Sequence, residues 1–408
     1  MSSFLVSERL ISDRTSQGCS FSGALNSRNV VDYLMSVGLW PEEERIKSID
    51  TLLGKNFNLR VRGGDRDLLV KQAPCELDGR LSDDLLQAVW FHQMLEMAET
   101  EELRSRVIPP LHFDQARATL VFPFLHDVQS LSELYNDWLS DEVRAEPLPV
   151  ETASEVGQTF AVLHRETFKN EKVKAFWMTR AYGGESEELL APDFSVGLRR
   201  LTPESFCLIS TDALKFFRFY KRYPEMEAAI LALNSAFVSC CAVHDDPRFA
   251  NLLLRVNGEL LLIDWEKWRW GDPAYDLGQM LASYVAMWLE SLPAIAQLDL
   301  GTVLNMATVP LAAITPSTQA LLRGYLACFP QILNHQPNFI VRVTQFIGLA
   351  LVRQVQRKIS QKQPIGNIEM AMAQVAKSLL CQPESSIPTV FGCGVEELNV
   401  CSQEAVCL

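Results

Sequence analysis

The segment VHDDPRFANLLL, residues 243 to 254, places two adjacent aspartates and an asparagine beside an apolar run. A second apolar run, ELLLI, ends at Asp264, and the segment GDPAYDLG follows with Asp272 and Asp276. Asp and Asn bond local backbone groups, so a solvated turn would explain some of these residues. A carboxylate at the end of a buried strand, however, is costly unless it is paired or binds a metal. The region therefore indicates a polar site within an apolar surrounding.

Phosphoryl transfer is the chemistry that these side chains fit. It needs a carboxylate that accepts the proton of the attacking group and oxygen ligands that hold Mg²⁺ on the nucleotide. Mg²⁺ prefers hard oxygen ligands and takes only one or two protein carboxylates. Asp246 and Asn251 bracket PRFA in one loop, so their side chains can face a common site. Asp264 directly follows the neighbouring apolar strand, so its side chain can reach the same site.

The composition of the chain limits the number of its lobes and the kinds of partner that it can bind. The chain has 408 residues, which indicates two lobes, and 48% of them are hydrophobic. Its 37 basic and 50 acidic side chains give a formal charge of −13, which argues against nucleic acid as the main partner. Ten cysteines show no CxxC pair. No apolar run approaches the ~20 residues of a membrane helix, and no signal peptide is visible, so we expect a cytoplasmic protein without a membrane partner.

The N-terminal part is predicted to be small and rich in strands. Residues 1–26 are polar and partly loose, and 29–39 show helical spacing. NFNLRV (56–61) and DLLVKQ (67–72) are typical of strands, joined by a hairpin turn in which Gly63 and Gly64 are free to take positive φ. A helix follows over 82–106, and ATLVFPFL (118–125) predicts a buried strand.

The rest of the chain is predicted to be mainly helical, so the fold class is α+β. Amphipathic patterns cover 151–168 and the segment from 211 up to Pro224. The stretch 243–276 reads as loop and short strand, and helical signals resume from 277 to about 380. We therefore expect four parts, namely an N-lobe (1–122), a hinge (123–127), a helical C-lobe (128–381) and a tail (382–408).

The predicted strands offer two candidate phosphate contacts. Lys71 ends the strand DLLVK, where a partly buried lysine can grip a phosphate as a point charge. It could equally be a strand-end lysine that reaches solvent. The loop LLGKNFN contributes Gly54 and Asn56, and exposed backbone N–H groups in such a turn can cradle an anion.

The ordered motifs resemble those of the aminoglycoside phosphotransferase and choline kinase superfamily, which has a bilobal, protein-kinase-like fold. Its pattern is HGDxxxxN, then an apolar strand ending in ID, then GDPxxDL. This chain has HDD with Asn251 at 244–251, IDW at 263–265 and GDPAYDL at 271–277. Upstream, VGQTFAVLH (156–164) is similar to a family helix that ends in Leu-His, and LLVK and VFPFL resemble the nucleotide-binding strand and the hinge.

The resemblance, which runs from about residue 49 to 285 and more weakly to 360, implies ATP and Mg²⁺ as cofactors. It implies that Asp246, five positions before Asn251, is the catalytic base, and that Asn251 and Asp264 bind the metal. Arg248 would touch the transferring phosphate, although a plain surface arginine is equally compatible with its position. The candidate cofactor-binding positions are therefore Lys71, Pro123, Phe124 and Leu125 from the resemblance, together with Gly54 and Asn56 from the turn before the first of these strands.

The other motif residues are expected to be structural. His244 would hold the loop by hydrogen bonds, and Asp272 and Asp276 would bond loop backbone or cap the next helix. Two positions depart from the family's pattern. Asp245 stands where a glycine is usual, and Gln87 stands where the strand lysine normally finds a glutamate, with Asp84 nearly one turn earlier as an alternative.

The acceptor is open between two classes. Residues 198–237, IDWEKWRWGDPAYDLG and YVAMWLESLP resemble a branch of kinase-like proteins of ribosomally made peptide pathways, including thioamitides and class V lanthipeptides, which pair with a HopA1-like lyase. This implies Ser or Thr of a precursor peptide as acceptor, phosphorylated before elimination by the lyase. The alternative acceptor is a small molecule such as an amino sugar, a choline-like amine or a sugar. A pseudokinase, supported only by the two departures, is the non-catalytic alternative.

Overall fold

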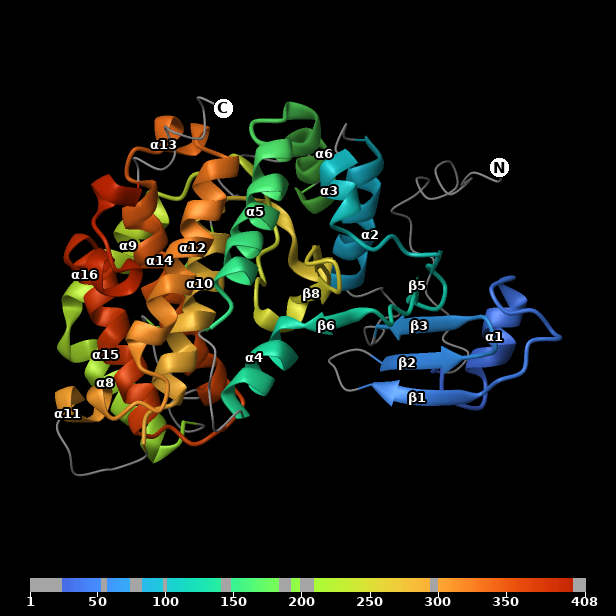
Figure 1. The fold of residues 1–408 in the computed structure, drawn as a ribbon, viewed down its shortest axis with the longest axis horizontal. Helices are drawn as coiled ribbons and strands as arrows, with labels where there is room; N and C mark the ends of the chain where they lie inside the picture. The colour runs from blue at the N-terminus through green and yellow to red at the C-terminus, as the bar shows by residue number, and fades with distance from the viewer. Residues whose placement is uncertain are drawn as a thin grey trace. The chain divides into compact units, whose positions relative to one another are not determined.

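The computed structural model describes residues 24–52, 57–73, 83–97, 101–140, 148–182, 192–198, 209–293 and 300–398. The chain divides into two compact units. The N-unit comprises Met1–Val89 and Pro109–His126, and the C-unit comprises Trp90–Ile108 and Asp127–Leu408. The N-unit holds a small antiparallel sheet, whereas the C-unit is mostly helical (Figure 1). The predicted α+β class, with a small β-rich part followed by a large helical part, is therefore confirmed.

A five-stranded antiparallel sheet forms the N-unit, in the order β1-β2-β3-β5-β4. Its strands are β1 (Ser48–Leu52), β2 (Phe57–Arg62), β3 (Asp67–Gln72), β4 (His112–Asp114) and β5 (Thr119–Pro123). Alternate residues of the central strands, among them Val61 and Val70, are buried in one cluster with helix α1 (Val30–Ser36). The strands predicted over 56–61, 67–72 and 118–125 are present, whereas β4 falls where the sequence pattern indicates no strand.

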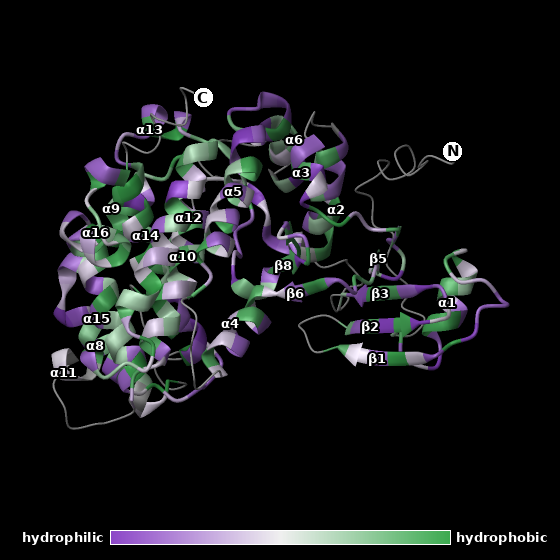
Figure 2. Ribbon diagram, viewed as in Figure 1, coloured by the Kyte–Doolittle hydropathy of each residue, from purple (hydrophilic) through white to green (hydrophobic). Residues whose placement is uncertain are grey.

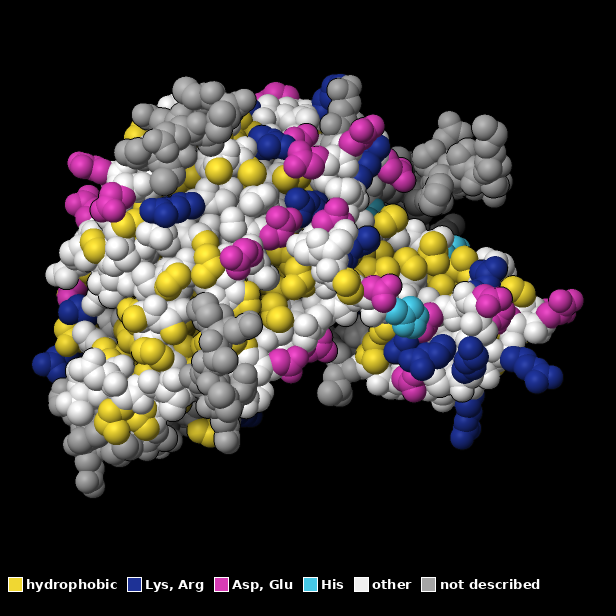
Figure 3. All heavy atoms as spheres, viewed as in Figure 1, with side chains coloured by type: hydrophobic (Ala, Val, Ile, Leu, Met, Phe, Trp, Pro, Cys, Tyr) yellow, Lys and Arg dark blue, Asp and Glu magenta, His cyan; other side chains and the backbone are white. Residues whose placement is uncertain are grey.

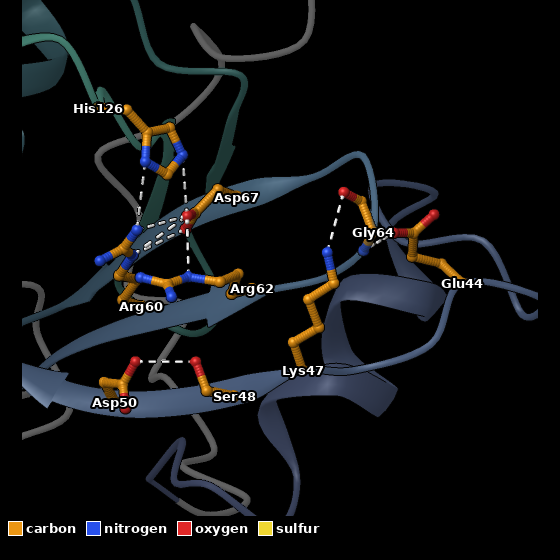
Figure 4. Close-up of polar contacts among 9 residues, drawn as sticks. All are labelled: Glu44, Lys47, Ser48, Asp50, Arg60, Arg62, Gly64, Asp67 and His126. Atoms are coloured by element: carbon orange, nitrogen blue, oxygen red, sulfur yellow. Dashed lines mark hydrogen bonds and ion pairs between the residues drawn. The ribbon is translucent and has the colours of Figure 1, made fainter.

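The β2–β3 hairpin is confirmed, but its glycines act differently from expectation. Arg62 pairs with Asp67 across the turn. Neither Gly63 nor Gly64 has a positive φ. Gly63 is needed for close approach instead, since a Cβ there would lie 2.9 Å from the Trp40 ring. Glu44 accepts a hydrogen bond from the Gly64 backbone, which fixes the turn against the segment before β1 (Figure 4).

The helix predicted over 82–106 consists of two helices, α2 (Asp83–Met97) and α3 (Glu101–Ser105). The division between the units falls within α2, so the predicted boundary at residue 122 needs correction. Val89 packs with sheet residues of the N-unit. Phe91, two positions on, stacks on Trp265 of the C-unit with ring centroids 3.5 Å apart. Residues 90–108 thus belong to the C-unit because their apolar contacts lie there.

The C-unit is a large assembly of helices with two small sheets. The helices are α4 (Leu131–Ser140), α5 (Val150–Thr167), α6 (Glu171–Tyr182), α8 (Thr211–Arg222), α9 (Pro224–Ser235), α10 (Pro273–Glu290), α11 (Leu300–Asn305), α12 (Leu311–Cys328), α13 (Gln331–His335), α14 (Phe339–Ser360), α15 (Asn367–Cys381) and α16 (Pro383–Phe391). The strands are β6 (Val128–Ser130), β7 (Cys241–Val243), β8 (Leu252–Arg255), β9 (Leu260–Leu262) and β10 (Arg269–Gly271). Pro224 starts α9 at a position where a missing N–H costs nothing.

The core of the C-unit lies around α5, α10, α12 and α14. Helix α10 buries almost its whole length, and in Figure 2 the helices of this unit show hydrophobic and hydrophilic turns side by side. Such banding is expected of helices that pack one face inward. In the part of the chain that the structure describes, no helix combines the length and the apolar character needed to cross a membrane.

The tail predicted over 382–408 needs correction up to residue 398. Helix α16 lies in this segment, and its buried side chains join the core of the C-unit. Thr318 of α12 donates its hydroxyl to the Val390 carbonyl at 2.6 Å. Two prolines in nine residues, Pro383 and Pro388, obscure the helical pattern in the sequence. Residues 399–408 lie outside the described residues.

Candidate active site

The segment after β7 is held by a carboxylate from another element. Asp276 lies fully buried in the first turn of α10. Its two oxygens accept hydrogen bonds from the backbone N–H groups of His244 (2.6 Å) and Asp245 (2.9 Å). His164, at the end of α5, lies 3.2 Å from the same carboxylate through its Nε2. The expectation that Asp276 is structural is confirmed, and the Leu-His helix end adds a second anchor.

His244 also holds the loop, as expected. Its ring Nε2 donates to the Ile263 carbonyl at 2.9 Å, and the ring packs against Trp265 with centroids 4.7 Å apart. The ring therefore ties the loop to the segment that follows β9. Because the imidazole is fully buried, it is shielded from solvent and suited to positioning.

Asp272 caps helix α10, as predicted. Its Oδ1 accepts from the Ala274 N–H at 3.0 Å, and its Oδ2 accepts from the Val238 N–H at 2.9 Å. Arg342 of α14 forms an ion pair with the same carboxylate, and both side chains are buried. Burial lowers the pKa of Arg342 to about 10. The start of α10 is thereby fixed to the long central helix.

Asp246 forms ion pairs with two cationic side chains of the same segment. It is 6% exposed, and its Oδ2 lies 3.0 Å from the guanidinium of Arg248 and 2.9 Å from the ammonium of Lys267. Both ion pairs use one oxygen of the carboxylate. The structure thus brings Arg248 to the predicted base. Sequence reasoning missed Lys267, whose only signal is a basic side chain soon after a strand-end aspartate.

Asn251 and Asp264 lie at the same end of the β8–β9 hairpin. Leu252 pairs with Leu262, and the Ile263 N–H donates to the Asn251 carbonyl at 3.1 Å. The side-chain N–H of Asn251 donates to the Asp246 carbonyl at 2.9 Å, which leaves its amide oxygen as the acceptor for another group. Asp264 adopts the left-handed conformation, with φ 68° and ψ 58°.

These oxygens suit a magnesium ion. An asparagine oxygen and one carboxylate are the hard donors that Mg²⁺ takes from a protein, with water and phosphate oxygens completing its shell. Within the described ranges, no group of three or more His, Cys, Asp or Glu side chains is placed to hold a metal. One amide oxygen and one carboxylate leave most of the shell of such an ion to water and phosphate oxygens.

Asp245 differs from its neighbour in conformation and environment. It has a φ of 64°, a value that glycine tolerates at no cost and aspartate adopts more readily than most residues. Its Oδ2 lies 3.5 Å from Arg269 Nε. Burial raises the pKa of Asp245 to about 7, with Arg269 and Lys267 opposing the shift and Asp276 and Asp246 adding to it. The substitution for glycine thus adds a carboxyl group that is readily protonated.

A cavity of about 710 Å³ opens beside these residues, and all of its lining belongs to the C-unit. The loop 245–248 forms one wall, and α10 and α14 contribute Tyr275, Gln279 and Arg353. Phe194 and Phe217 add apolar surface. This volume lies within the range of sites that bind small molecules or short side chains. Asp246 therefore borders a space that a small molecule can enter.

The N-unit carries the other predicted positions. Lys71 is half-buried in β3, on the face opposite the buried Val70, and its strand partner Leu120 packs with the first part of α2. Gln87 lies in α2 and is also half-buried. Pro123 is the last residue of β5, and Phe124 and Leu125 follow it, all three partly exposed. Gly54 and Asn56 lie outside the described residues.

A charged cluster fixes the segment after β5 to the sheet. The carboxylate of Asp67 forms ion pairs with Arg60 (2.6 Å), Arg62 (3.4 Å) and His126 (3.0 Å), as Figure 4 shows. Burial would raise the pKa of Asp67, but the hydrogen bonds and charges of its partners hold it below the usual range. The guanidinium of Arg60 lies 3.7 Å above the Phe124 ring. Figure 3 shows Lys and Arg side chains gathered over the strands of this unit.

Comparisons with known proteins give one family match and several similar structures. Residues 199–306 match the family model described as APH, the phosphotransferase enzyme family. An ethanolamine kinase of Plasmodium vivax is similar in structure, with a TM-score of 0.50 and 13% identity over 86% of this chain and 89% of that chain. A glucosamine kinase reaches 0.49 at 13% identity over 88% of each chain. A choline kinase of Streptococcus pneumoniae reaches 0.47 at 12% identity, over 86% of this chain and 98% of that chain.

The sequence matches none of the curated proteins with which it was compared. The segment matched by the family model contains Asp246, Asn251 and Asp264, which the structure brings to one loop and one hairpin end. The Plasmodium vivax structure shows a shared fold. Residues 199–306 thus match the phosphotransferase enzyme family, in line with the predicted resemblance to aminoglycoside phosphotransferases and choline kinases, and the fold is similar to that of the Plasmodium vivax ethanolamine kinase.

Proposed function

We propose that the protein transfers the γ-phosphoryl group of ATP to a hydroxyl acceptor, with Mg²⁺ as the metal. The observation that supports this most is the placement of Asp246. Its carboxylate lines the cavity, is paired through one oxygen with two cations, and lies beside the oxygen donors of the β8–β9 hairpin. A base, neighbouring positive charge and metal ligands are the parts that phosphoryl transfer requires.

In the proposed reaction Asp246 orients the acceptor hydroxyl and takes its proton. The hydroxyl oxygen forms a bond to the γ-phosphorus as the bond from that phosphorus to the bridging oxygen breaks, and ADP leaves. Arg248 and Lys267 hold one oxygen of the carboxylate, so the other can meet the hydroxyl. Both head groups are partly exposed and can also contact phosphate oxygens as charge spreads over them.

Asn251 and Asp264 are the proposed magnesium ligands. Bound Mg²⁺ would neutralise charge on the phosphates of the nucleotide. Lys71 is the proposed phosphate contact of the N-unit, together with Gly54 and Asn56 of the loop before β2. Pro123, Phe124 and Leu125 are proposed to hold the nucleotide base, because this segment resembles the hinge of the family. The segment is fixed to the sheet, since the backbone carbonyl of Asp67 accepts a hydrogen bond from the Phe124 N–H at 2.9 Å.

The proposed acceptor is Ser or Thr of a ribosomally made peptide. The resemblance of residues 198–237 and 284–293 to peptide-modifying kinases supports this acceptor, and a HopA1-like lyase would then eliminate the phosphate. The charge of the cavity favours it over an amine, because arginine and lysine outnumber carboxylates among the described lining residues. A small-molecule alcohol is the acceptor against which the proposal is tested.

Phosphate transfer from Mg·ATP by the wild type and by Asp246→Asn tests this proposal. Peptides encoded by neighbouring genes, amino sugars and amino alcohols would be offered, with and without the candidate lyase. Transfer to a peptide Ser or Thr is expected, and the variant should lower kcat by about 10² to 10⁴-fold, since general bases typically contribute this much. Nucleotide binding measured by calorimetry should persist in the variant, because Asp246 is not a proposed nucleotide contact.

The other outcomes of this experiment separate the alternatives. Transfer only to a small alcohol, lost in Asp246→Asn, would keep the mechanism and replace the acceptor. Nucleotide binding without transfer to any compound would favour a pseudokinase. Transfer that survives Asp246→Asn unchanged would remove Asp246 from the role of base.

A further inference from the structure

The cavity beside Asp246 has a positively charged wall. The described charged residues that line it are the cations Arg248, Lys267, Arg353 and Arg357 and the carboxylates Asp245 and Asp246. The remaining described lining is uncharged. A cavity of this composition attracts anionic groups and repels cationic ones.

The two carboxylates already have cationic partners. Asp246 pairs with Arg248 and Lys267, and Asp245 lies 3.5 Å from Arg269. A cationic acceptor would have to compete with these cations for the same two carboxylates. The charge balance of the site therefore disfavours an amine.

Arg353 and Arg357 lie one turn apart in α14 and both line the cavity. Residues four apart share one face of a helix. Arg353 donates to the backbone carbonyls of Asp193 (3.3 Å), Phe194 (2.9 Å) and Val196 (3.2 Å). These acceptors are neutral, so they hold the side chain in place without cancelling its charge.

Arg357 is exposed to solvent. Within the described ranges, its guanidinium forms neither a hydrogen bond nor an ion pair. A guanidinium presents five donors in a rigid fork that matches a carboxylate with two parallel hydrogen bonds. Arg357 can thus bind an anionic group without giving up an existing contact.

Resting on the function proposed above, we propose that the acceptor carries a carboxylate that binds Arg357, supported by the charge of Arg353, while its hydroxyl meets Asp246. In a peptide acceptor this carboxylate belongs to an acidic residue near the Ser or Thr that is phosphorylated. The same positive wall acts against amino sugars and choline-like amines, because an unmatched like charge is repelled. Arg357 is then a specificity-determining residue of the acceptor site.

The test uses short peptides with one Ser in an Ala and Gly background, carrying Glu, Gln or Lys at a scanned neighbouring position. Binding is measured by calorimetry, and phosphate transfer from Mg·ATP is measured separately, for the wild type, Arg357→Glu and Arg255→Glu. Arg255 is an exposed arginine of β8 that does not line the cavity, so Arg255→Glu makes the same change of charge elsewhere. Glyceric acid and ethanolamine serve as small anionic and cationic alcohols.

The best Glu peptide should bind at least about tenfold more tightly than its Gln counterpart, as expected for a hydrogen-bonded charge pair. Arg357→Glu should remove this preference and favour the Lys peptide, whereas Arg255→Glu should keep it. Equal binding of Glu and Gln peptides, an unchanged preference in Arg357→Glu, or a preference for ethanolamine over glyceric acid would overturn the inference. Binding with the Glu preference but without transfer would support it and refute the proposed phosphotransfer.

Discussion

At the scale of single residues, the five aspartates of the region 244–276 have different roles. Asp272 and Asp276 are fully buried and accept backbone hydrogen bonds, so they shape the loop. Asp246 lines the cavity with two cations, and Asp264 lies just after the buried strand β9. Asp245 is the unusual member, because a left-handed backbone and a carboxyl with a raised pKa of about 7 occur together there.

The environment of Asp245 predicts a pH-dependent cost to stability. Its pKa in the folded protein is about 7, above the ordinary 3.8. Between these values the unfolded chain releases the proton while the folded protein keeps it, so the unfolding free energy falls as pH rises from about 4 to about 7. Asp245→Asn removes the ionisable carboxyl group. Because asparagine tolerates a positive φ, the substitution preserves the backbone conformation.

The free energy of unfolding of Asp245→Asn, measured by urea titration from pH 5 to 8, should therefore rise relative to the wild type up to about pH 7 and stay constant above it. Asp50→Asn, an exposed carboxylate of β1, is the control and should show no such trend. A difference between Asp245→Asn and the wild type that does not vary with pH would contradict the burial of this carboxyl.

At the scale of elements, the contact between α5 and α12 positions the anchor of the loop. Gly157 and Gly324 face the opposite helix, and a Cβ on Gly157 would lie 2.9 Å from backbone atoms of Leu321 and Tyr325. The close approach lets His164 of α5 meet the Tyr325 hydroxyl at 3.0 Å. His164 in turn lies beside the carboxylate that holds the loop after β7.

Gly157→Ala should destabilise the protein. Glycine to alanine inside an exposed helix normally gains about 1 kcal/mol, so a loss would be diagnostic of the close contact. We expect the unfolding free energy to fall by about 1–3 kcal/mol, the usual cost of overpacking. Glu151→Ala, at an exposed position of the same helix, should change it by less than about 0.5 kcal/mol. If chemical denaturation gave Gly157→Ala a higher free energy of unfolding than the wild type, α5 and α12 would be able to move apart without cost.

At the scale of the whole molecule, both units differ in extent from the sequence-based division. The second half of α2 joins the C-unit, and the segment 382–398 is part of its core. Helix α16 buries Phe391 completely, beside other apolar side chains of the helices around it. The compact part of the C-unit therefore continues well beyond residue 381.

Phe391→Ala tests this extent. Removing a fully buried aromatic side chain typically costs about 3–5 kcal/mol, a large share of the 5–15 kcal/mol that stabilises a domain. Thermal unfolding should shift to clearly lower temperature, whereas Thr389→Ala, at an exposed position of the same helix, should leave it nearly unchanged. Equal melting temperatures for the two variants would restore the interpretation of this segment as a tail.

The sequence by itself determined the features that depend on neighbouring residues. The alternation of apolar and polar residues indicates strands β2 and β3, and Pro224 marks the start of α9. The spacing of Asp246 and Asn251 indicates the loop that carries them. The capping role of Asp272 was predictable for the same reason, because its partner Ala274 is two residues away.

The tertiary structure decided the features that join distant parts of the chain. Lys267 meets Asp246 across 21 residues, and Arg353 meets Phe194 across 159, so no local pattern announces either contact. The close approach of Gly63 to Trp40 and the burial of Phe391 likewise depend on which surfaces face each other after folding. The charge around the cavity is a sum over such contacts, so the preference for an anionic acceptor that we propose follows from the folded chain and not from any local sequence pattern.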